Sequence, residues 1–246
     1  MPAVESMIIV ALTFLVAGFV KGVTGLGLPT VSLAILTVAL GLQPAMAILL
    51  GPSLVTNVWQ ALVGGHLGEI LRRTWGLLAA LCAATWLGVG VLASAGADLL
   101  TGLLGLLVCA YAILGLVRLD PPPPGRSEAW LSPLVGTVSG ILNGMTGSFV
   151  VPGVFYLQAL RFPRDAFIQA MGVLFATATV ALGLALHDRR LLSADLAVLS
   201  AGAVAPALIG MVAGQAVRQH LSEAIFRTVF FAALLVIGAY IVIRVV

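Results

Sequence analysis

The chain has 246 residues, of which 61% are hydrophobic and only 9% charged, and its net charge is +3. Its mean hydropathy is +1.17. A soluble globular protein carries roughly 25% charged residues, so this composition excludes a water-soluble fold and predicts an all-α, polytopic membrane protein. At about 20 apolar residues per crossing, there is room for about seven to ten crossings. The positive charges lie mainly in short loops, which suits membrane topology and not nucleic-acid binding.

The first apolar run, from about Met7 to Leu40, is interrupted near its centre. Between Gly18 and Thr30 it contains Lys21, four glycines, one proline and two threonines. Lipid tolerates a broken backbone only where protein or a water-filled cavity surrounds it. A lysine near the bilayer centre costs at least ~2.5–3.5 kcal/mol. We therefore expect this stretch to face an internal cavity.

Further apolar elements follow, with a polar loop expected around His66, Glu69, Arg72 and Arg73. The elements are Pro44–Gly64, Trp75–Ala95, Leu99–Val117, Trp130–Leu160, Ala166–Leu186, Ala194–Val217 and Ala224–Val245. The most hydrophilic segment, Arg118 to Glu128, contains four consecutive prolines. These prolines predict a stiff extended connector. The predicted organisation is a first membrane repeat (residues 1–119), a linker (120–128) and a second membrane repeat (129–246).

The interruption of the first run recurs in the second half of the chain. The first copy is Gly18, Gly22, Thr24 and Gly25, and each has its match 122 positions later, at Gly140, Gly144, Thr146 and Gly147. Looser matches follow, such as Pro44 with Pro163. Their order, with a linker between them, indicates an internal duplication.

The orientation of the two halves depends on how the broken elements cross. The pieces Met7–Lys21 and Leu26–Leu40 are each about 22 Å long as helices, which is too short for a hydrocarbon core of about 30 Å. One interrupted crossing, a re-entrant pair and two thin crossings all remain open. An odd number of crossings per half places eight loop arginines, including Arg118, on one side and three on the other. The positive-inside rule therefore favours inverted repeats with a cytoplasmic linker.

Paired interrupted segments at matching positions of two halves indicate the binding site of a transporter. The start of a half-helix exposes amide N–H groups and a favourable dipole for an anion, and glycine lets a ligand approach closely. Lys21 adds a positive charge where the second copy has neutral Asn143, which suits a small monoanion or dianion. The predicted substrate-binding residues are Lys21, Gly22, Thr24, Gly25, Asn57, Gln60, Asn143, Gly144, Thr146, Gly147, Ser148 and Gln169.

Structural alternatives exist for most of these residues. Gly-x-x-x-Gly is a common helix-packing motif in membranes, so Gly22 and Gly144 could serve only to let helices touch. Lys21 could extend to a membrane interface. Asn57 and Gln60 could bond a neighbouring helix instead of lining a cavity.

The chain resembles the TauE/SafE family of sulfite and organosulfonate exporter-like permeases. The resemblance rests on Gly22–Gly27, Asn57–Gln60, Gly144–Pro152 and Gln169–Gly172, in that order. It implies transport of small anions, with sulfur oxoanions, organosulfonates and related carboxylates as candidates. The family often has a fuller glycine run after the first Gly-x-Gly. Here Leu28-Pro29 and Phe149-Val150 stand in its place, so we expect a different cavity shape.

Together these features predict a secondary transporter, not an enzyme, that works by alternating access in the inner cell membrane. No nucleotide-binding Gly-x-x-x-x-Gly-Lys-Ser/Thr motif is present, so we expect coupling to an ion gradient, with H+ as the coupling ion. No cofactor or metal site is predicted. The alternatives are a thiol redox protein that uses Cys82 and Cys109, and a passive anion channel. A homodimer is an open alternative to a monomer.

Overall fold

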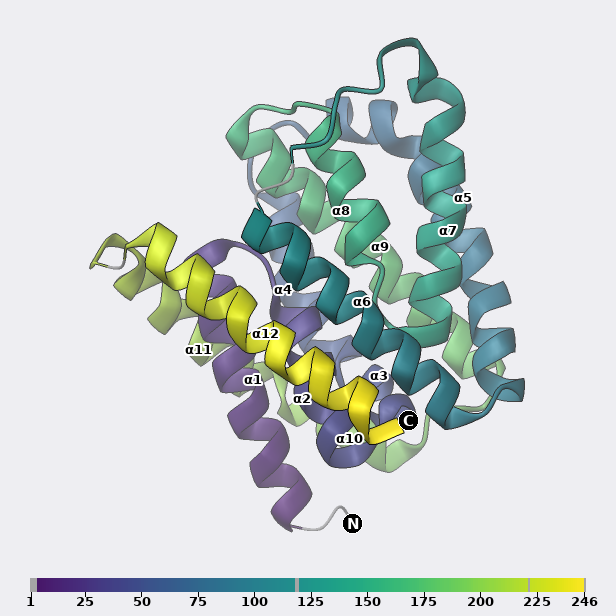
Figure 1. Cartoon of the computed structure of the whole chain (residues 1–246), viewed down its shortest axis with the longest axis vertical. Coiled ribbons are helices and arrows are strands. Elements are labelled where there is room, and N and C mark those ends of the chain that lie inside the picture. The colour runs from purple at the N-terminus through teal and green to yellow at the C-terminus, as the bar shows by residue number, and fades with distance from the viewer. Residues whose placement is uncertain (1–3, 118–119, 221, 246) are drawn as a thin grey trace. The chain divides into compact units, whose positions relative to one another are not determined.

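The computed structural model describes residues 4–117, 120–220 and 222–245. Over these residues the chain is helical with short connections and has no strand (Figure 1), which confirms the all-α prediction. Arg118, which the topology argument counted, lies outside the described residues. The helices are α1 (Val4–Thr24), α2 (Leu28–Leu40), α3 (Leu42–Ile48), α4 (Leu50–Leu62), α5 (Leu67–Ser94), α6 (Ala97–Val117), α7 (Glu128–Thr146), α8 (Val150–Ala159), α9 (Arg164–Asp188), α10 (Ala194–Gly202), α11 (Val204–Val217) and α12 (Glu223–Val245), with 3₁₀ turns at Gly125–Ser127 and Arg218–His220.

Six stretches of the described chain are long and apolar enough to cross a membrane. They are α1, α5, α6, α9, α10 taken together with α11, and α12. The adjoining α3 and α4 would make a seventh if they form one broken span. This is the pattern of a multi-pass membrane protein, and each predicted apolar element has a helical counterpart.

The predicted division of the first element into two equal short pieces is wrong. Helix α1 continues through Gly18 and Gly22 and has 21 residues, a length of about 31 Å that is sufficient to cross. Helix α2 has only 13 residues. The second half repeats this asymmetry, with 19 residues in α7 and 10 in α8. Helix α1 stays continuous at Gly18 and Gly22 because both glycines pack against a neighbouring helix.

The prediction of a polar loop at residues 66–73 is also wrong for the residues that follow His66. Helix α5 begins at Leu67, and Glu69 lies in its first turn, where a carboxylate interacts favourably with the helix dipole. Arg73 donates to both carboxylate oxygens of Glu128, at 2.7 and 2.9 Å, and to the carbonyl oxygen of Leu160 at 2.9 Å. This bidentate hydrogen bond holds the pKa of the Glu128 carboxyl below its usual value. The loop residues are therefore helical and tied into the fold.

The helices form two compact units. The first contains α1, α2, α3, α6, α10, α11 and α12, and the second contains α5, α7, α8, α9 and the part of α4 from Ser53 onward. Each unit thus combines helices from both predicted halves of the sequence. The first broken element lies in the first unit and the second broken element in the second unit.

In the first unit, α1 packs closely on α11 (Figure 1). A side chain at Gly18 would overlap the carbonyl oxygen of Ala207, and one at Gly22 would overlap that of Met211. Gly210 in turn lies against Leu15. Because the contacts advance along both helices together, α1 and α11 run parallel with their backbones in contact.

Helices α6 and α12 form the other long contact of the first unit (Figure 1). Gly105 faces Val242, and Gly115 faces Phe231. The residue numbers of the contacting positions rise along α6 as they fall along α12, so the two helices run antiparallel.

In the second unit, α5 and α7 pack in the same way as α1 and α11 (Figure 1). Side chains at Gly140 and Gly144 would overlap the carbonyl oxygens of Leu81 and Thr85, and one at Gly88 would overlap that of Ile141. These contacts also advance together, so α5 and α7 are parallel. Close approach at small residues is a usual basis of helix association in lipid.

We predict that Gly140→Ala lowers the stability of the protein by about 1–3 kcal/mol, the range for overpacked sites, because the new methyl group meets backbone atoms. Gly68→Ala is the matched control, since a Cβ there meets nothing within 4 Å. The measurement is thermal unfolding of the purified protein in detergent. An equal melting temperature for the two variants would contradict the close α5–α7 contact.

Candidate functional site

The long helix of each broken element ends in the same local structure. The Thr24 hydroxyl lies 2.9 Å from the carbonyl oxygen of Val20 and accepts a hydrogen bond from the Leu26 amide at 3.1 Å. The Thr146 hydroxyl lies 2.8 Å from the carbonyl oxygen of Leu142 and accepts from the Ser148 amide at 3.2 Å. In both copies, one threonine therefore ties the last helical turn to the connection that follows.

A glycine in the left-handed conformation follows each of these threonines. Gly25 has φ 78° and Gly147 has φ 73°, a backbone region that other residues rarely adopt. The Gly25 amide donates to the carbonyl oxygen of Lys21 at 2.7 Å, and the Gly147 amide donates to that of Asn143 at 2.8 Å. Lys21 and Asn143 thus occupy equivalent positions, as the sequence repeat predicts.

The short helices α2 and α8 begin without a side-chain cap. Their N-cap residues are Gly27 and Phe149, and neither has a side chain that can accept a hydrogen bond. The first amides of a helix have no partner within the helix, and they favour an anion when no cap occupies them. Each broken element therefore presents an uncapped helix N-terminus directly after the Thr-Gly turn.

The residue at the equivalent position differs in charge and in environment between the two copies. Lys21 is the only lysine in the sequence, lies in the last turn of α1 and is 5% exposed. Asn143 is buried in the second unit, where its amide donates to the carbonyl oxygen of Ala178 at 3.1 Å and to the Thr85 hydroxyl at 3.4 Å. The positive charge at this position is therefore present only in the first copy.

Gly22 and Gly144 lie on the faces that pack against α11 and α5. Those faces are filled by the backbone of the neighbouring helix, as the packing alternative expects. At the first break the backbone is accessible at the Thr-Gly turn instead, because a Cβ at Gly25 would meet nothing within 4 Å. At the second break Gly147 is buried.

The predicted glutamines connect α4 to α9 within the second unit. Gln169 donates to the Ala61 carbonyl oxygen at 2.8 Å, and its own carbonyl oxygen accepts from the His66 amide at 2.8 Å. Gln60 donates to the Ile168 carbonyl oxygen at 2.7 Å. Asn57 and Ser148 are buried in the same unit. The amide groups of both glutamines are thus used in joining the two helices.

Two features of the breaks were not selected from the sequence. Gly27, with φ 95°, is the N-cap of α2, and its signal was the Gly25-x-Gly27 spacing. Thr85 is a buried partner of Asn143, and nothing in the sequence distinguished it from other threonines in apolar runs.

Neither cysteine forms a disulfide, and both are partly exposed. Cys109 lies at the α6–α12 contact, where its sulfur is 3.9 Å from the Leu235 carbonyl oxygen. Among the described residues, no three His, Cys, Asp or Glu side chains come together as metal ligands.

A comparison with protein-family models matches the chain to the family described as Sulfite exporter TauE/SafE, over residues 10–241. The match covers nearly the whole chain and includes both broken elements. Searches of curated proteins and of solved structures gave no match.

We predict that Thr24→Val and Thr146→Val each lower stability by about 0.5–1.5 kcal/mol, the net value of a typical hydrogen bond, because each removes the acceptor at a helix break. Thr24→Ser and Thr146→Ser keep the hydroxyl and should melt near the wild-type temperature in detergent. A valine variant that melts like the wild type would contradict this structural role.

Proposed function

This chain belongs to the sulfite exporter TauE/SafE family, and from that premise we propose that it is a secondary transporter that carries small sulfur oxoanions or related organic anions across the membrane by alternating access. The family consists of transporters, so transport and not catalysis is the expected activity. Sulfite is the first candidate because the family description names it. Organosulfonates and short carboxylates are the next candidates because they carry similar charge in a similar size.

The observation that carries this proposal is a buried lysine in the last helical turn before an uncapped helix start. Lys21 is 5% exposed, and α2 begins seven positions later, at Leu28, after a turn whose N-cap offers no side-chain acceptor. A cation and free helical amides are the two groups that bind oxyanions in proteins. An intramembrane ionisable residue is itself a functional-site hypothesis. We assign the anion to this break, with Lys21 and the amides of Leu28 and Thr30 as its ligands. The amides of the Thr24-Gly25 turn are already bonded within the turn, so the turn positions these ligands and does not itself bind the anion.

The second break supplies a neutral counterpart in this proposal. The Thr146–Ser148 turn repeats the hydrogen bonds of the first break, with Asn143 in place of the lysine. The start of α8 differs in its backbone, with φ −141° at Phe149 against 95° at Gly27. The full charge is thus present only at the first break, where we place an anion that must be released again. Binding that is too strong would slow release.

The proposed alternating access rests on inverted repeats, for which helix directions give support. The last helices of the two halves, α6 and α12, are equivalent in the repeat and run antiparallel, as an inversion requires. The first helix of each half packs in parallel on a helix of the other half: α1 on α11, and α7 on α5. This exchange is the arrangement expected when two inverted copies intertwine.

An ion gradient is the proposed source of energy, because the sequence contains no nucleotide-binding loop. We propose H+ as the coupling ion and the inner cell membrane as the location. A passive anion channel is the second candidate. Saturation of flux with substrate and its dependence on a pH gradient separate a carrier from a channel.

We predict that proteoliposomes with the wild-type protein take up ³⁵S-labelled sulfite saturably, and faster when a pH gradient is imposed. Lys21→Ala should lower this flux about 10- to 100-fold, because a hydrogen bond to a charged group contributes about 1.5–3 kcal/mol. Lys21→Arg keeps the charge and should retain part of the flux.

Arg126→Ala is the matched control, since it removes one positive charge from an exposed position in the linker. All variants are compared at equal reconstituted amounts and after size-exclusion chromatography. Wild-type flux in Lys21→Ala would contradict the assigned role of the lysine. Flux that rises linearly with sulfite and ignores the pH gradient would favour the channel.

A further inference from the structure

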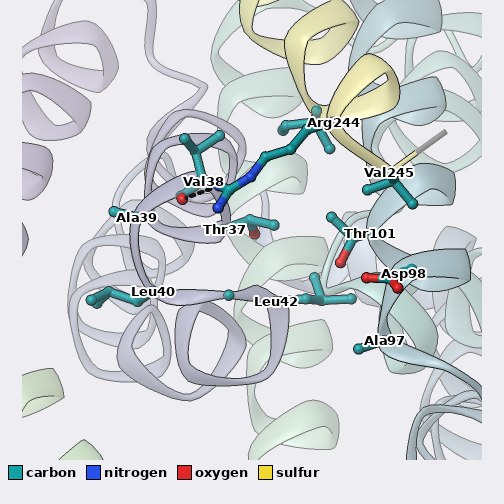
Figure 2. A pocket seen from close by; sticks show the side chains of 12 residues that line it. Thr37, Val38, Ala39, Leu40, Leu42, Ala97, Asp98, Thr101, Arg244 and Val245 are labelled. Atoms are coloured by element: carbon teal, nitrogen blue, oxygen red, sulfur yellow. Dashed lines mark hydrogen bonds between the residues drawn. The ribbon is translucent and has the colours of Figure 1, made fainter.

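A cavity of about 400 Å³ lies within the first unit, away from the Thr-Gly turns (Figure 2). It is formed where α2 ends, α6 begins and α12 ends. The charged and hydroxyl-bearing residues in its wall are Thr37, Asp98, Thr101 and Arg244. The rest of the wall is backbone and aliphatic side chains. Its size is within the range of small-molecule sites.

The cavity has opposite charges on different sides. Arg244, in the last turn of α12, is held against α2 by a hydrogen bond of 2.8 Å from its Nη1 atom to the Val38 carbonyl oxygen. Asp98 and Thr101, one turn apart on α6, extend toward the cavity from the other side (Figure 2). A guanidinium has further N–H donors beyond the one used here, so it can still bind an oxyanion.

Thr37 gives an independent indication of a ligand. Its side chain is 4% exposed, and its hydroxyl oxygen has no hydrogen-bond partner among the described residues. Figure 2 shows the Thr37 side chain in the wall of the cavity, between the Arg244 and Thr101 side chains. A buried polar group without a partner costs about 1–3 kcal/mol, and a bound donor or acceptor would remove that cost.

The position of the cavity along the helices indicates where its ligand comes from. Helix α6 has 21 residues, about 31 Å, which matches a hydrocarbon core of about 30 Å. Asp98 is in its first turn, and Arg244 is in the last turn of the neighbouring span α12. Both charges are therefore at the same end of two candidate membrane spans, where lipid headgroups would lie.

We propose that this cavity binds a zwitterion that joins an oxyanion to a primary ammonium, such as the phosphoethanolamine headgroup of a lipid or a free compound with the same two groups. The oxyanion binds Arg244, and the ammonium donates to Asp98, Thr101 and Thr37. A simple anion would be repelled by the Asp98 carboxylate, and a simple cation by the Arg244 guanidinium. Only a ligand with both charges satisfies both walls.

The test is native mass spectrometry of the full-length protein in detergent, titrated separately with phosphatidylethanolamine, phosphatidylcholine and phosphatidylglycerol. We expect phosphatidylethanolamine to bind about tenfold more tightly than phosphatidylcholine, because a quaternary ammonium cannot donate the hydrogen bonds to Asp98 and the threonines. Asp98→Asn should remove this preference, and Arg244→Gln should weaken the binding of phosphatidylethanolamine about tenfold.

Asp195→Asn is the matched control, because Asp195 is also an exposed aspartate in the first turn of a helix. Thr37→Val separates a ligand role from a structural one. It removes an unpartnered hydroxyl, so the ligand-free melting temperature should stay equal or rise, while the affinity for phosphatidylethanolamine falls.

Free glycerophosphoethanolamine at millimolar concentration distinguishes the two sources of the zwitterion. Displacement of the bound lipid assigns the site to free zwitterions as well, and no displacement assigns it to the lipid alone. Equal binding of phosphatidylethanolamine and phosphatidylcholine would overturn the proposal. So would a preference for phosphatidylethanolamine that persists in Asp98→Asn, or an affinity for phosphatidylethanolamine that is unchanged in Arg244→Gln.

Discussion

The peptide group cannot be left without hydrogen bonds in an apolar membrane, and the two helix breaks of this chain are built around that constraint. Thr24 and Thr146 bond the connection after each helix, and Gly25 and Gly147 close the last turn through left-handed backbone. These bonds pair the carbonyl oxygens of Lys21 and Asn143 and the amides of Leu26 and Ser148 within the protein. The starts of the short helices receive no side-chain cap, which leaves them suited to an anion.

The long helices that precede these breaks are packed closely against neighbouring helices. Glycines on α1 and α11, and on α5 and α7, let the paired backbones touch in parallel, where lipid offers no hydrophobic force to drive association. Two of the glycines that the sequence repeat indicated for ligand approach, Gly22 and Gly144, thus face a neighbouring helix. Gly25 and Gly147, which follow the threonines, instead supply the left-handed backbone. Lys21 carries the only full charge at the breaks.

Much of this architecture could be predicted from the sequence, because apolar runs and repeated motifs are local signals. The positions of the apolar elements and the equivalence of Thr24 with Thr146 are examples. The continuation of α1 beyond Lys21 through Gly22 could not be predicted, since Gly22 packs against Met211, nearly 190 residues later in the chain. Gln169 looked like a cavity residue, yet its bonds to Ala61 and His66 exist only after α4 and α9 meet. Asp98 and Arg244 each looked like an ordinary helix-end residue until folding placed them around one cavity.

An anion site at the first helix break is tested most directly by equilibrium binding of ³⁵S-labelled sulfite to the purified protein in detergent. Binding is measured by scintillation proximity for the wild type, Lys21→Ala and Lys21→Arg. We predict saturable binding that is lost in the alanine variant and weakened but retained in the arginine variant. Equal sulfite binding by the wild type and Lys21→Ala would contradict an anion site at the first helix break.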